Sequence, residues 1–511
     1  MSTTTAAPVA NPTWYGDIRQ MFTPTDVAHM GKQGLDLTSY EEVRNSAGNI
    51  YGQVASKQMP RPTPWPDDWI ATFLNWMTNS FPKGTNPAPA RASVAAARAP
   101  MKQAGRIRKE ITKLSGPELD TLKKAFNGIL AKGTDDPNSY FVQAGYHWLP
   151  NLFCQHHVPG YNPWHRAYLI SFENALRSVP GCENVTLPYW DITTPFPEVL
   201  KSAPFDSYTL PKDVGTDFPA GYKTERYPYP EIQQNLIDYQ VAGDIKRALS
   251  KTDWEDFHGG WGDQPGFGGS SNNTIIQAHD SGHGSIGPTM AQQSVAAFDP
   301  VFWFFHANWD RLFWQWQQQM HATTLDTLLT TINKTTDILS YQIFTMPVLE
   351  NLAPFTANPP KLSTLSIIDS VNSLDVDYQD PETRTAMAFL PKTQRAVPAS
   401  QTFTVHPDRV NVRVGGLNRL KIPGSFKVIL LKDGKPIAAR FFFQPNEVEK
   451  CPNCVNNAVV HFDFELPLAE VANGKLDVAV EPVNKSFVGN RFPQKMMGNP
   501  TVDVHLLMTT E

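Results

Sequence analysis

The chain has 511 residues, more than one ordinary hydrophobic core accommodates, so we expect two or three folded units. Hydrophobic residues make up 41% and aromatic residues 11% of the sequence, enough for a large core and for aromatic-lined pockets. The formal net charge is −5 without a long run of one sign, which argues against a nucleic-acid surface or a polybasic membrane patch.

Targeting and membrane signals are absent from the sequence. The first eleven residues are small and polar, without the basic and apolar segments of a secretion signal. No apolar stretch reaches the roughly 18 residues that a membrane span requires. The four cysteines are too few for a disulfide framework. We therefore expect a cytoplasmic protein without membrane or nucleic-acid partners, and the sequence leaves open whether it forms a homo-oligomer.

Residues 1–105 are predicted to form an N-terminal extension and a surface arm. One helix-like apolar pattern runs through Trp69, Phe73, Leu74, Trp76 and Met77. Residues 86–99 are rich in Ala and Pro, which is typical of a linker or an arm on the surface.

Residues 106–380 are predicted to form a mainly helical domain. From Ile107 onward, apolar residues recur at about 3.6-residue spacing as far as Ile129. Two further helices are expected over residues 164–177 and 304–320, each with a wet face and a densely aromatic or aliphatic face.

The pattern changes to β-strands after about residue 400. Short, partly alternating apolar runs occupy residues 402–414, 425–431, 437–443, 458–466, 475–481 and 502–508. Asp433 and Gly434 stand between two of these runs, which is a signal for a tight hairpin. We expect a β sandwich or barrel over residues 400–511, joined to the helical domain by a linker at residues 381–399.

Six histidines have a spacing that suits metal binding. A single histidine is more often a plain core or surface residue, but two sets of three favour a metal centre. The absence of carboxylate and thiolate ligands argues against magnesium, calcium, di-iron or iron–sulfur, and leaves copper or a catalytic zinc. The two sets are His147, His156 and His165, and His279, His283 and His306.

The motifs around these histidines resemble a known family. The first runs from His147 through Cys154-Gln-His156 and Asn-Pro-Trp-His165-Arg-Ala-Tyr-Leu-Ile-Ser-Phe-Glu173 to Leu187-Pro-Tyr-Trp-Asp191. The second combines His279-Asp-Ser-Gly-His283 with Asp299-Pro-Val-Phe-Trp-Phe-Phe-His306-Ala-Asn-Trp-Asp310. Over roughly residues 106–380 the chain resembles the tyrosinases, catechol oxidases and molluscan haemocyanins, the type 3 copper proteins. The resemblance implies a four-helix bundle around two copper ions.

The resemblance also assigns roles within the centre. It implies that the first triad holds one copper and the second triad the other, that His157 is a bystander, and that Cys154 forms a thioether with His156. Phe305 departs from the many relatives that carry a second His there, a position that is not a ligand. Asp310 is the expected residue for orienting an imidazole, with a plain salt bridge to Arg311 or Arg166 as the alternative.

Tyrosinases that retain a C-terminal β domain resemble residues 400–511. This resemblance implies a lid over the copper site, an aromatic placeholder in the pocket and a Cys-x-x-Cys pair that delivers Cu(I). Here the pair would be Cys451 and Cys454, and the placeholder one of Phe441, Phe442 and Phe443. The alternatives are ordinary β-core packing for the phenylalanines, and half a zinc site, a redox motif or an inert turn for the cysteines.

The implied function is copper-dependent oxidation of phenols by dioxygen as co-substrate. It comprises ortho-hydroxylation of monophenols and oxidation of o-diphenols to o-quinones. A catechol or o-aminophenol oxidase without hydroxylation and a haemocyanin-like oxygen carrier are the alternatives; six intact histidines disfavour a protein that has lost its metal. Asp280 is the candidate base for the phenol proton, with a pKa lowered by copper charge, or else a residue that only buttresses its helix.

Overall fold

The computed structural model describes most of the chain. The described residues are 8–22, 26, 30, 35–57, 64–84, 105–147, 155–259, 274–332, 338–345, 349, 352–355, 362–379, 403–451, 454–455, 457–483 and 492–510. Among them, no helix is long and apolar enough to cross a membrane. Both predicted linkers, residues 86–99 and 381–399, lie outside these ranges, and so does Cys154.

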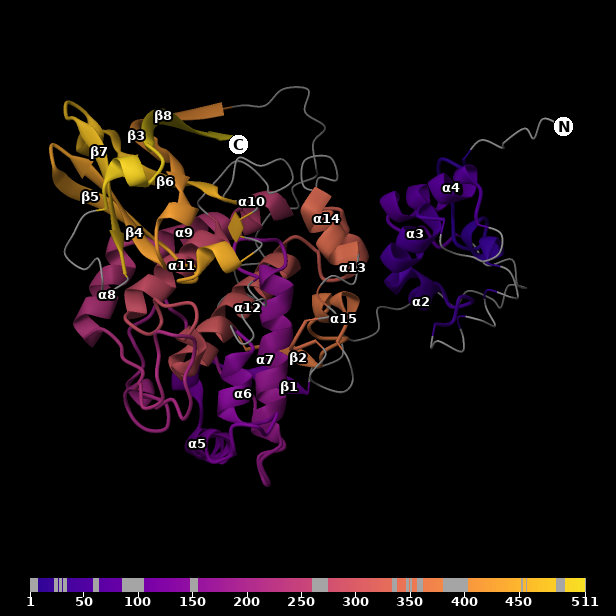
Figure 1. Ribbon diagram of the computed structural model, residues 1–511, viewed down its shortest axis with the longest axis horizontal. Coiled ribbons are helices and arrows are strands. Elements are labelled where there is room, and N and C mark those ends of the chain that lie inside the picture. Colours follow the sequence, from indigo (N-terminus) through magenta and orange to yellow (C-terminus); the bar gives the residue numbers. More distant parts are fainter. Residues whose placement is uncertain are drawn as a thin grey trace.

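The described part contains a helical region followed by a β domain (Figure 1). Apart from the helices introduced below, the described α-helices are α2 (Tyr40–Asn45), α3 (Ala47–Ala55), α4 (Asp67–Thr78), α8 (Tyr229–Asp238), α9 (Val241–Leu249), α10 (Trp254–His258), α13 (Leu325–Leu329), α14 (Ile338–Thr345), α15 (Thr364–Ile368) and α18 (Leu468–Val471). Helix α4 coincides with the predicted N-terminal helix.

The first 84 residues have a hydrophobic cluster of their own. Trp14, Trp65, Phe73 and Trp76 pack together in it, apart from the main core. One link to the helical region is the ion pair between Arg44 on α2 and Asp326 on α13, with 2.5 Å between Nη2 and Oδ1. The described residues before position 85 thus form a small helical unit with a core of its own.

Helix α5 begins later than its apolar periodicity predicts. It spans Gly116–Leu130, because Ser115 and Glu118 form a capping box and Pro117 suits the first helical turn. The preceding residues Arg106–Arg108 form strand β1, which pairs in parallel with β2 (Val376–Tyr378). The expectation of a helix from Ile107 was therefore wrong, since long-range pairing with β2 outweighs local periodicity there.

The two central helices are buried on nearly all sides. Helix α7 spans Tyr161–Arg177 and α12 spans Val301–Gln319, close to their predicted bounds. The predicted wet faces do not exist, because their charged residues pair inside the protein. Glu173 accepts from Arg108 at 3.0 Å, and Asp310 accepts from Arg166 at 2.5 Å, so burial leaves these charges compensated.

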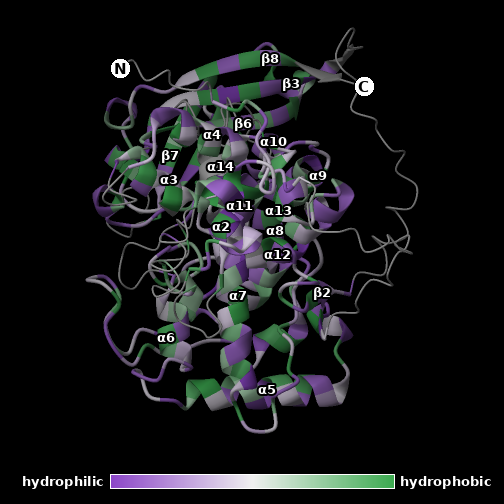
Figure 2. Ribbon diagram, turned by 90° about the vertical axis from the view of Figure 1, so that its right-hand side faces the viewer, coloured by the Kyte–Doolittle hydropathy of each residue, from purple (hydrophilic) through white to green (hydrophobic). Residues whose placement is uncertain are grey.

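The C-terminal domain consists of two three-stranded antiparallel sheets, as expected of a sandwich. Their orders are β6-β3-β8 and β5-β4-β7. Apolar and polar residues alternate along β3 and β8 (Figure 2). Asp433 and Gly434 both have positive φ and form the predicted hairpin between β4 and β5. The strands are β3 (Phe403–Asn418), β4 (Phe426–Lys432), β5 (Lys435–Phe442), β6 (Val459–Pro467), β7 (Leu476–Pro482) and β8 (Thr501–Thr510).

Strand β5 lies against helix α11 (Ile275–Ile286), which carries two of the site histidines. The ring of Phe441 occupies the space beside Gly284, where any Cβ would fall 2.2 Å from the ring. Arg440 is fully buried, donates to the backbone oxygen of Tyr239 at 2.9 Å and lies 3.4 Å from the carboxylate of Asp244. These contacts seat the β domain directly on the helix of the candidate site.

Candidate metal centre

Two groups of three histidines converge in the interior of the helical domain. Within each group the ring nitrogens that could bind a metal lie within 4.8 Å of one another, and all six residues are buried. Helix α7 carries His165, α11 carries the i, i+4 pair His279 and His283, and α12 carries His306. His147 follows α6 (Tyr140–Gly145), and His156 precedes α7 in a loop. The groups are the same two triads that the sequence predicts.

Hydrogen bonds from Nδ1 to backbone carbonyls orient three of these rings. The Nδ1–H of His147 donates to the carbonyl of Gln293 at 2.9 Å, and that of His283 to the carbonyl of Met290 at 2.7 Å. His165 donates to the carbonyl of Tyr161 one helical turn earlier, at 2.8 Å. Because a carbonyl only accepts, each of these rings in its neutral form presents a lone pair at Nε2.

Ring nitrogens that converge at short range make the centre suited to a cation. The Nε2 atoms of His147 and His156 are 3.3 Å apart, and those of His283 and His306 are 3.2 Å apart. The Nε2 atoms of His165 and His279 are buried without a hydrogen-bond partner. Burial lowers the pKa of all six rings, that of His147 to about 4, which favours the neutral imidazoles that can bind a metal. The donor set therefore fits a metal bound by neutral imidazoles.

His157 lies outside both triads, as its predicted bystander role requires, but it has a defined partner. Its backbone is in the left-handed region, with φ of 59°, so the consecutive rings of His156 and His157 serve different partners. The Nε2–H of His157 donates to Oδ2 of Asp280 at 2.7 Å. The ring also stacks on Phe442, with centroids 4.4 Å apart and 15° between planes.

Asp280 connects a candidate metal ligand to the β domain. Its Oδ1 accepts from the Nδ1–H of His279 at 3.0 Å, and its Oδ2 accepts from His157 and from the backbone N–H of Phe443 at 3.1 Å. Burial raises the pKa of the Asp280 carboxyl, opposite to the lowering expected from copper charge, while the N–H of Phe443 and the charge of Arg419 act against that rise. These contacts are those of a residue that orients His279.

Asp310 contacts charged and hydroxyl groups. Its Oδ1 accepts from Arg166, and its Oδ2 accepts from the Tyr378 hydroxyl at 2.5 Å and from Arg108 at 3.3 Å. The salt bridge with Arg166 was the alternative to an imidazole-orienting role. These hydrogen bonds therefore favour a role of Asp310 in fixing α12 against α7 and β1.

The three consecutive phenylalanines of the β domain have different positions. Phe443 enters the metal centre and lies parallel to His283, with centroids 4.0 Å apart and 15° between planes. It is also 5.2 Å from His156 and 5.9 Å from His279, so it touches both triads. Phe442 packs on His157, and Phe441 packs against Gly284. Phe443 is thus the residue placed where a pocket placeholder would lie.

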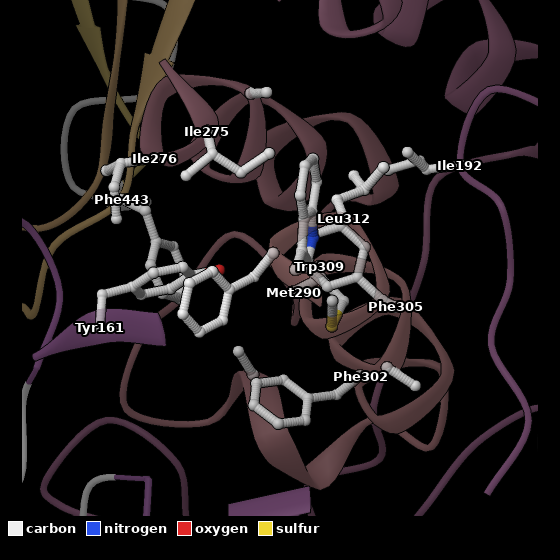
Figure 3. Packing of buried hydrophobic residues seen from close by; sticks show 14 of the residues in the cluster. Tyr161, Ile192, Ile275, Ile276, Met290, Phe302, Phe305, Trp309, Leu312 and Phe443 are labelled. Atoms are coloured by element: carbon white, nitrogen blue, oxygen red, sulfur yellow. The ribbon is translucent and has the colours of Figure 1, made fainter. Parts of the chain in front are cut away.

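Aromatic side chains of α12 complete the walls of the centre. Phe302, Phe305 and Trp309 lie with Phe443 and Tyr161 in one buried cluster (Figure 3). Phe305 packs on His283 at 4.7 Å between centroids. The departure from the family motif at Phe305 thus adds apolar surface beside the second triad.

Cys451 and Cys454 form a disulfide within the β domain. Both are buried, and Nη2 of Arg419 lies 3.2 Å from the sulfur of Cys454. The guanidinium of Arg419 also lies over the ring of Phe442, 4.7 Å from its centroid. A nearby guanidinium favours the thiolate form that soft metals bind, once the disulfide is reduced. The predicted thioether of Cys154 with His156 falls outside the described residues.

Several functional contacts have no signal in the sequence. The carbonyls of Gln293 and Met290 orient two rings, but a backbone carbonyl is common to every residue. The bond between His157 and Asp280 joins residues 123 positions apart, and adjacency to the triad histidines was the one available hint.

The fold and the site together define a histidine-only binuclear metal centre in a helical domain covered by a β domain. The common central domain of tyrosinase matches residues 137–227 and 202–319. A tyrosinase of Aspergillus oryzae is 26% identical over 446 residues, covering 63% of this chain and 80% of the relative. Tyrosinase HcTyr2 of Hahella sp. is 23% identical over 490 residues, covering 70% and 86%.

The similarity extends to oxygen carriers and to solved structures. An octopus haemocyanin from Enteroctopus dofleini is 28% identical over 243 residues, covering 43% of this chain and 8% of the relative. A variant of Aspergillus oryzae pro-tyrosinase has a TM-score of 0.56 at 17% identity, covering 81% and 93% of the two chains. It has the same layout of a helical core followed by antiparallel sheets.

The match to the common central domain of tyrosinase and the similarity to curated tyrosinases support a tyrosinase-family copper oxidase. The two all-histidine triads are the ligand set that the binuclear copper centre of that family would require.

Proposed function

We propose that the chain oxidises phenols with dioxygen, hydroxylating monophenols next to their hydroxyl group and converting o-diphenols to o-quinones. One monophenol and one dioxygen then yield one o-quinone and one water. The observation that carries the proposal is the flat aromatic ring of Phe443, stacked 4.0 Å from His283 between two imidazole triads. A phenol ring fits the space that this side chain fills.

In this proposal the residues of the chain hold the metals and orient the substrate. His147, His156 and His165 would hold one copper, and His279, His283 and His306 the other. When bound, the two copper ions supply dioxygen binding and electron transfer. The ring of a substrate would stack on His283 in place of Phe443, against the apolar wall that includes Phe305, from which water is excluded.

Asp280 is the group best placed to receive the phenol proton. Its Oδ2 accepts the backbone N–H of Phe443, so withdrawal of Phe443 frees an acceptor site next to the space that the substrate would enter. Oδ1 meanwhile continues to hold the Nδ1–H of His279. We infer that Asp280 both orients His279 and accepts a proton at Oδ2 during monophenol hydroxylation.

A comparison of substrates tests this function. Copper-loaded full-length protein should oxidise a small catechol and, more slowly, a monophenol. Asp280→Asn should reduce monophenol turnover about tenfold more than catechol turnover, because a catechol presents an easier oxidation and less need of a base. The measurement is the initial rate of both reactions, with copper content determined in each sample.

The other outcomes separate the alternatives. Catechol turnover without monophenol turnover in the wild type would identify a catechol oxidase. Reversible oxygen binding without turnover of either substrate would identify a carrier of the haemocyanin kind. Equal loss on both substrates with reduced copper in Asp280→Asn would leave Asp280 only its role in orienting His279.

We further propose that Cys451 and Cys454, once reduced, deliver Cu(I) to the centre. Arg419 lies beside the sulfur of Cys454 and over Phe442, which in turn stacks on His157 next to the first triad. The double substitution of Cys451 and Cys454 with Ser should slow copper loading from a Cu(I) donor by roughly tenfold or more, since two soft ligands are lost.

Fully loaded protein provides the control for copper delivery. Its catechol turnover should be the same in the double variant and the wild type, because neither cysteine belongs to a histidine triad. Replacement of Cys182, a buried free cysteine, with Ser controls for thiol loss elsewhere. Equal loading rates in all three proteins would assign the pair to a structural disulfide.

A further inference from the structure

Two consecutive lid residues dock on three polar side chains of the metal centre. The ring of Phe442 stacks on His157, the backbone N–H of Phe443 donates to Asp280, and the ring of Phe443 stacks on His283. Both rings lie within 15° of parallel with the imidazoles beneath them. The contact is therefore a specific three-point seat rather than general apolar packing.

Asp280 is the common point of this seat and of the second triad. It accepts three N–H donors, one from His279, one from His157 and one from Phe443. A carboxylate suits three donors because both oxygens only accept, whereas an amide would turn its own NH₂ group toward one of them. Oδ2 of Asp280 accepts from both His157 and Phe443. The hydrogen bond from the Nε2–H of His157 therefore helps to fix the position in which Oδ2 meets the backbone of Phe443.

The backbone of His157 points to a constraint at the same place. A non-glycine residue at φ of 59° is uncommon, and such a conformation persists only where surrounding contacts maintain it. It turns the His157 ring away from the first triad and toward Asp280 and Phe442. Asp280 belongs to helix α11, and Phe442 belongs to strand β5 of the lid.

We propose that His157 is a positioning residue that couples closure of the lid to the orientation of His279. Through Asp280, it places Oδ2 to receive the backbone of Phe443, and it places Oδ1 to hold the Nδ1–H of His279. Lid closure and ligand orientation then share one carboxylate, so loosening of either contact loosens the other. The inference rests on the proposed copper centre and lid, and it adds a residue outside both triads.

Hydrogen exchange in the copper-loaded full-length protein tests the coupling. His157→Phe keeps an aromatic ring for Phe442 but removes the donor to Asp280. We expect exchange in peptides containing Phe443 to become about tenfold faster, because a hydrogen bond to a buried carboxylate loses its alignment. Copper loss to a chelator should accelerate by a similar factor, while strand β4 (Phe426–Lys432) should keep its protection.

A second variant separates the hydrogen bond from general destabilisation. His157→Gln retains an N–H donor at the position of Nε2. Like Phe, Gln is a non-glycine residue that has to adopt the unfavourable left-handed backbone conformation at this position. It should restore slow exchange at Phe443 and slow copper loss. His321→Phe, at another histidine with left-handed backbone (φ of 54°) outside the triads, is the control and should leave exchange at Phe443 unchanged.

The outcomes distinguish this inference from the proposed function. Wild-type protein that binds no copper or oxidises no catechol would contradict the function, while the exchange at Phe443 remains measurable. Equal exchange at Phe443 in the wild type and in His157→Phe would overturn the coupling. Equal acceleration in the Phe and Gln variants would overturn it as well, because the donor would then be irrelevant.

Discussion

Replacement of His156 with Ala should lower copper content from two ions to one per chain. The first triad would retain two ligands, His147 and His165. Two ligands are too few to hold a metal ion against chelators in solution. Loss of a residue that only hydrogen-bonds to a metal ligand typically lowers activity by up to roughly 100-fold. Loss of the ligand His156 itself should lower catechol turnover by more than that. Metal analysis and the near-ultraviolet absorption that appears on oxygenation of the reduced protein provide the measurements.

The neighbouring histidine is the natural comparison for this result. His157→Gln should retain two coppers and most of the absorption, because His157 bonds Asp280 and belongs to neither triad. The opposite pattern, with copper lost from the His157 variant and kept in His156→Ala, would reverse the two assignments. Stoichiometric zinc without any oxygen-dependent absorption would contradict the copper assignment itself.

Gly284→Ala should activate the full-length protein by displacing the lid. An added Cβ on α11 would lie 2.2 Å from Cγ of Phe441, closer than any real contact, so strand β5 must move. Overpacking of this kind costs about 1–3 kcal/mol. If that cost falls on the closed lid, the open population rises roughly 5- to 150-fold, and turnover of bulky catechols should rise with it.

A second glycine of the same helix controls for the substitution. Gly282→Ala would place its Cβ 2.8 Å from the ring of Phe305 and 3.0 Å from Ile192, inside the helical domain. It should therefore not increase turnover. Phe443→Ala, which removes the ring stacked on His283, should reproduce the activation by Gly284→Ala. Unchanged turnover in both Gly284→Ala and Phe443→Ala would contradict the lid.

Local patterns in the chain were sufficient for much of the architecture. Apolar periodicity and the hairpin at Asp433-Gly434 depend on neighbours within a few residues, and they locate α7, α12 and the β strands closely. The histidine spacing likewise points to two sets of three, and the family resemblance selects His156 rather than His157 for the first set. The start of α5 was placed wrongly because β1 pairs with a strand that lies 270 residues later.

Long-range contacts decided the rest of the site. Among three successive phenylalanines, only the seating of β5 on α11 selects Phe443 for the metal centre. The wet faces expected on α7 and α12 disappeared because Arg108 and Arg166 meet Glu173 and Asp310 in the interior.

The sequence by itself therefore determined the two sets of histidines, the family resemblance of the motifs around them and the order of strands and turns, because each of these is carried by residues that are close together in the chain. Only the tertiary structure decided that His157 and Asp280 meet and that both meet the lid. Those contacts join residues that are distant in sequence through side-chain hydrogen bonds, and each bond requires a particular packing of α11, β5 and the loop before α7.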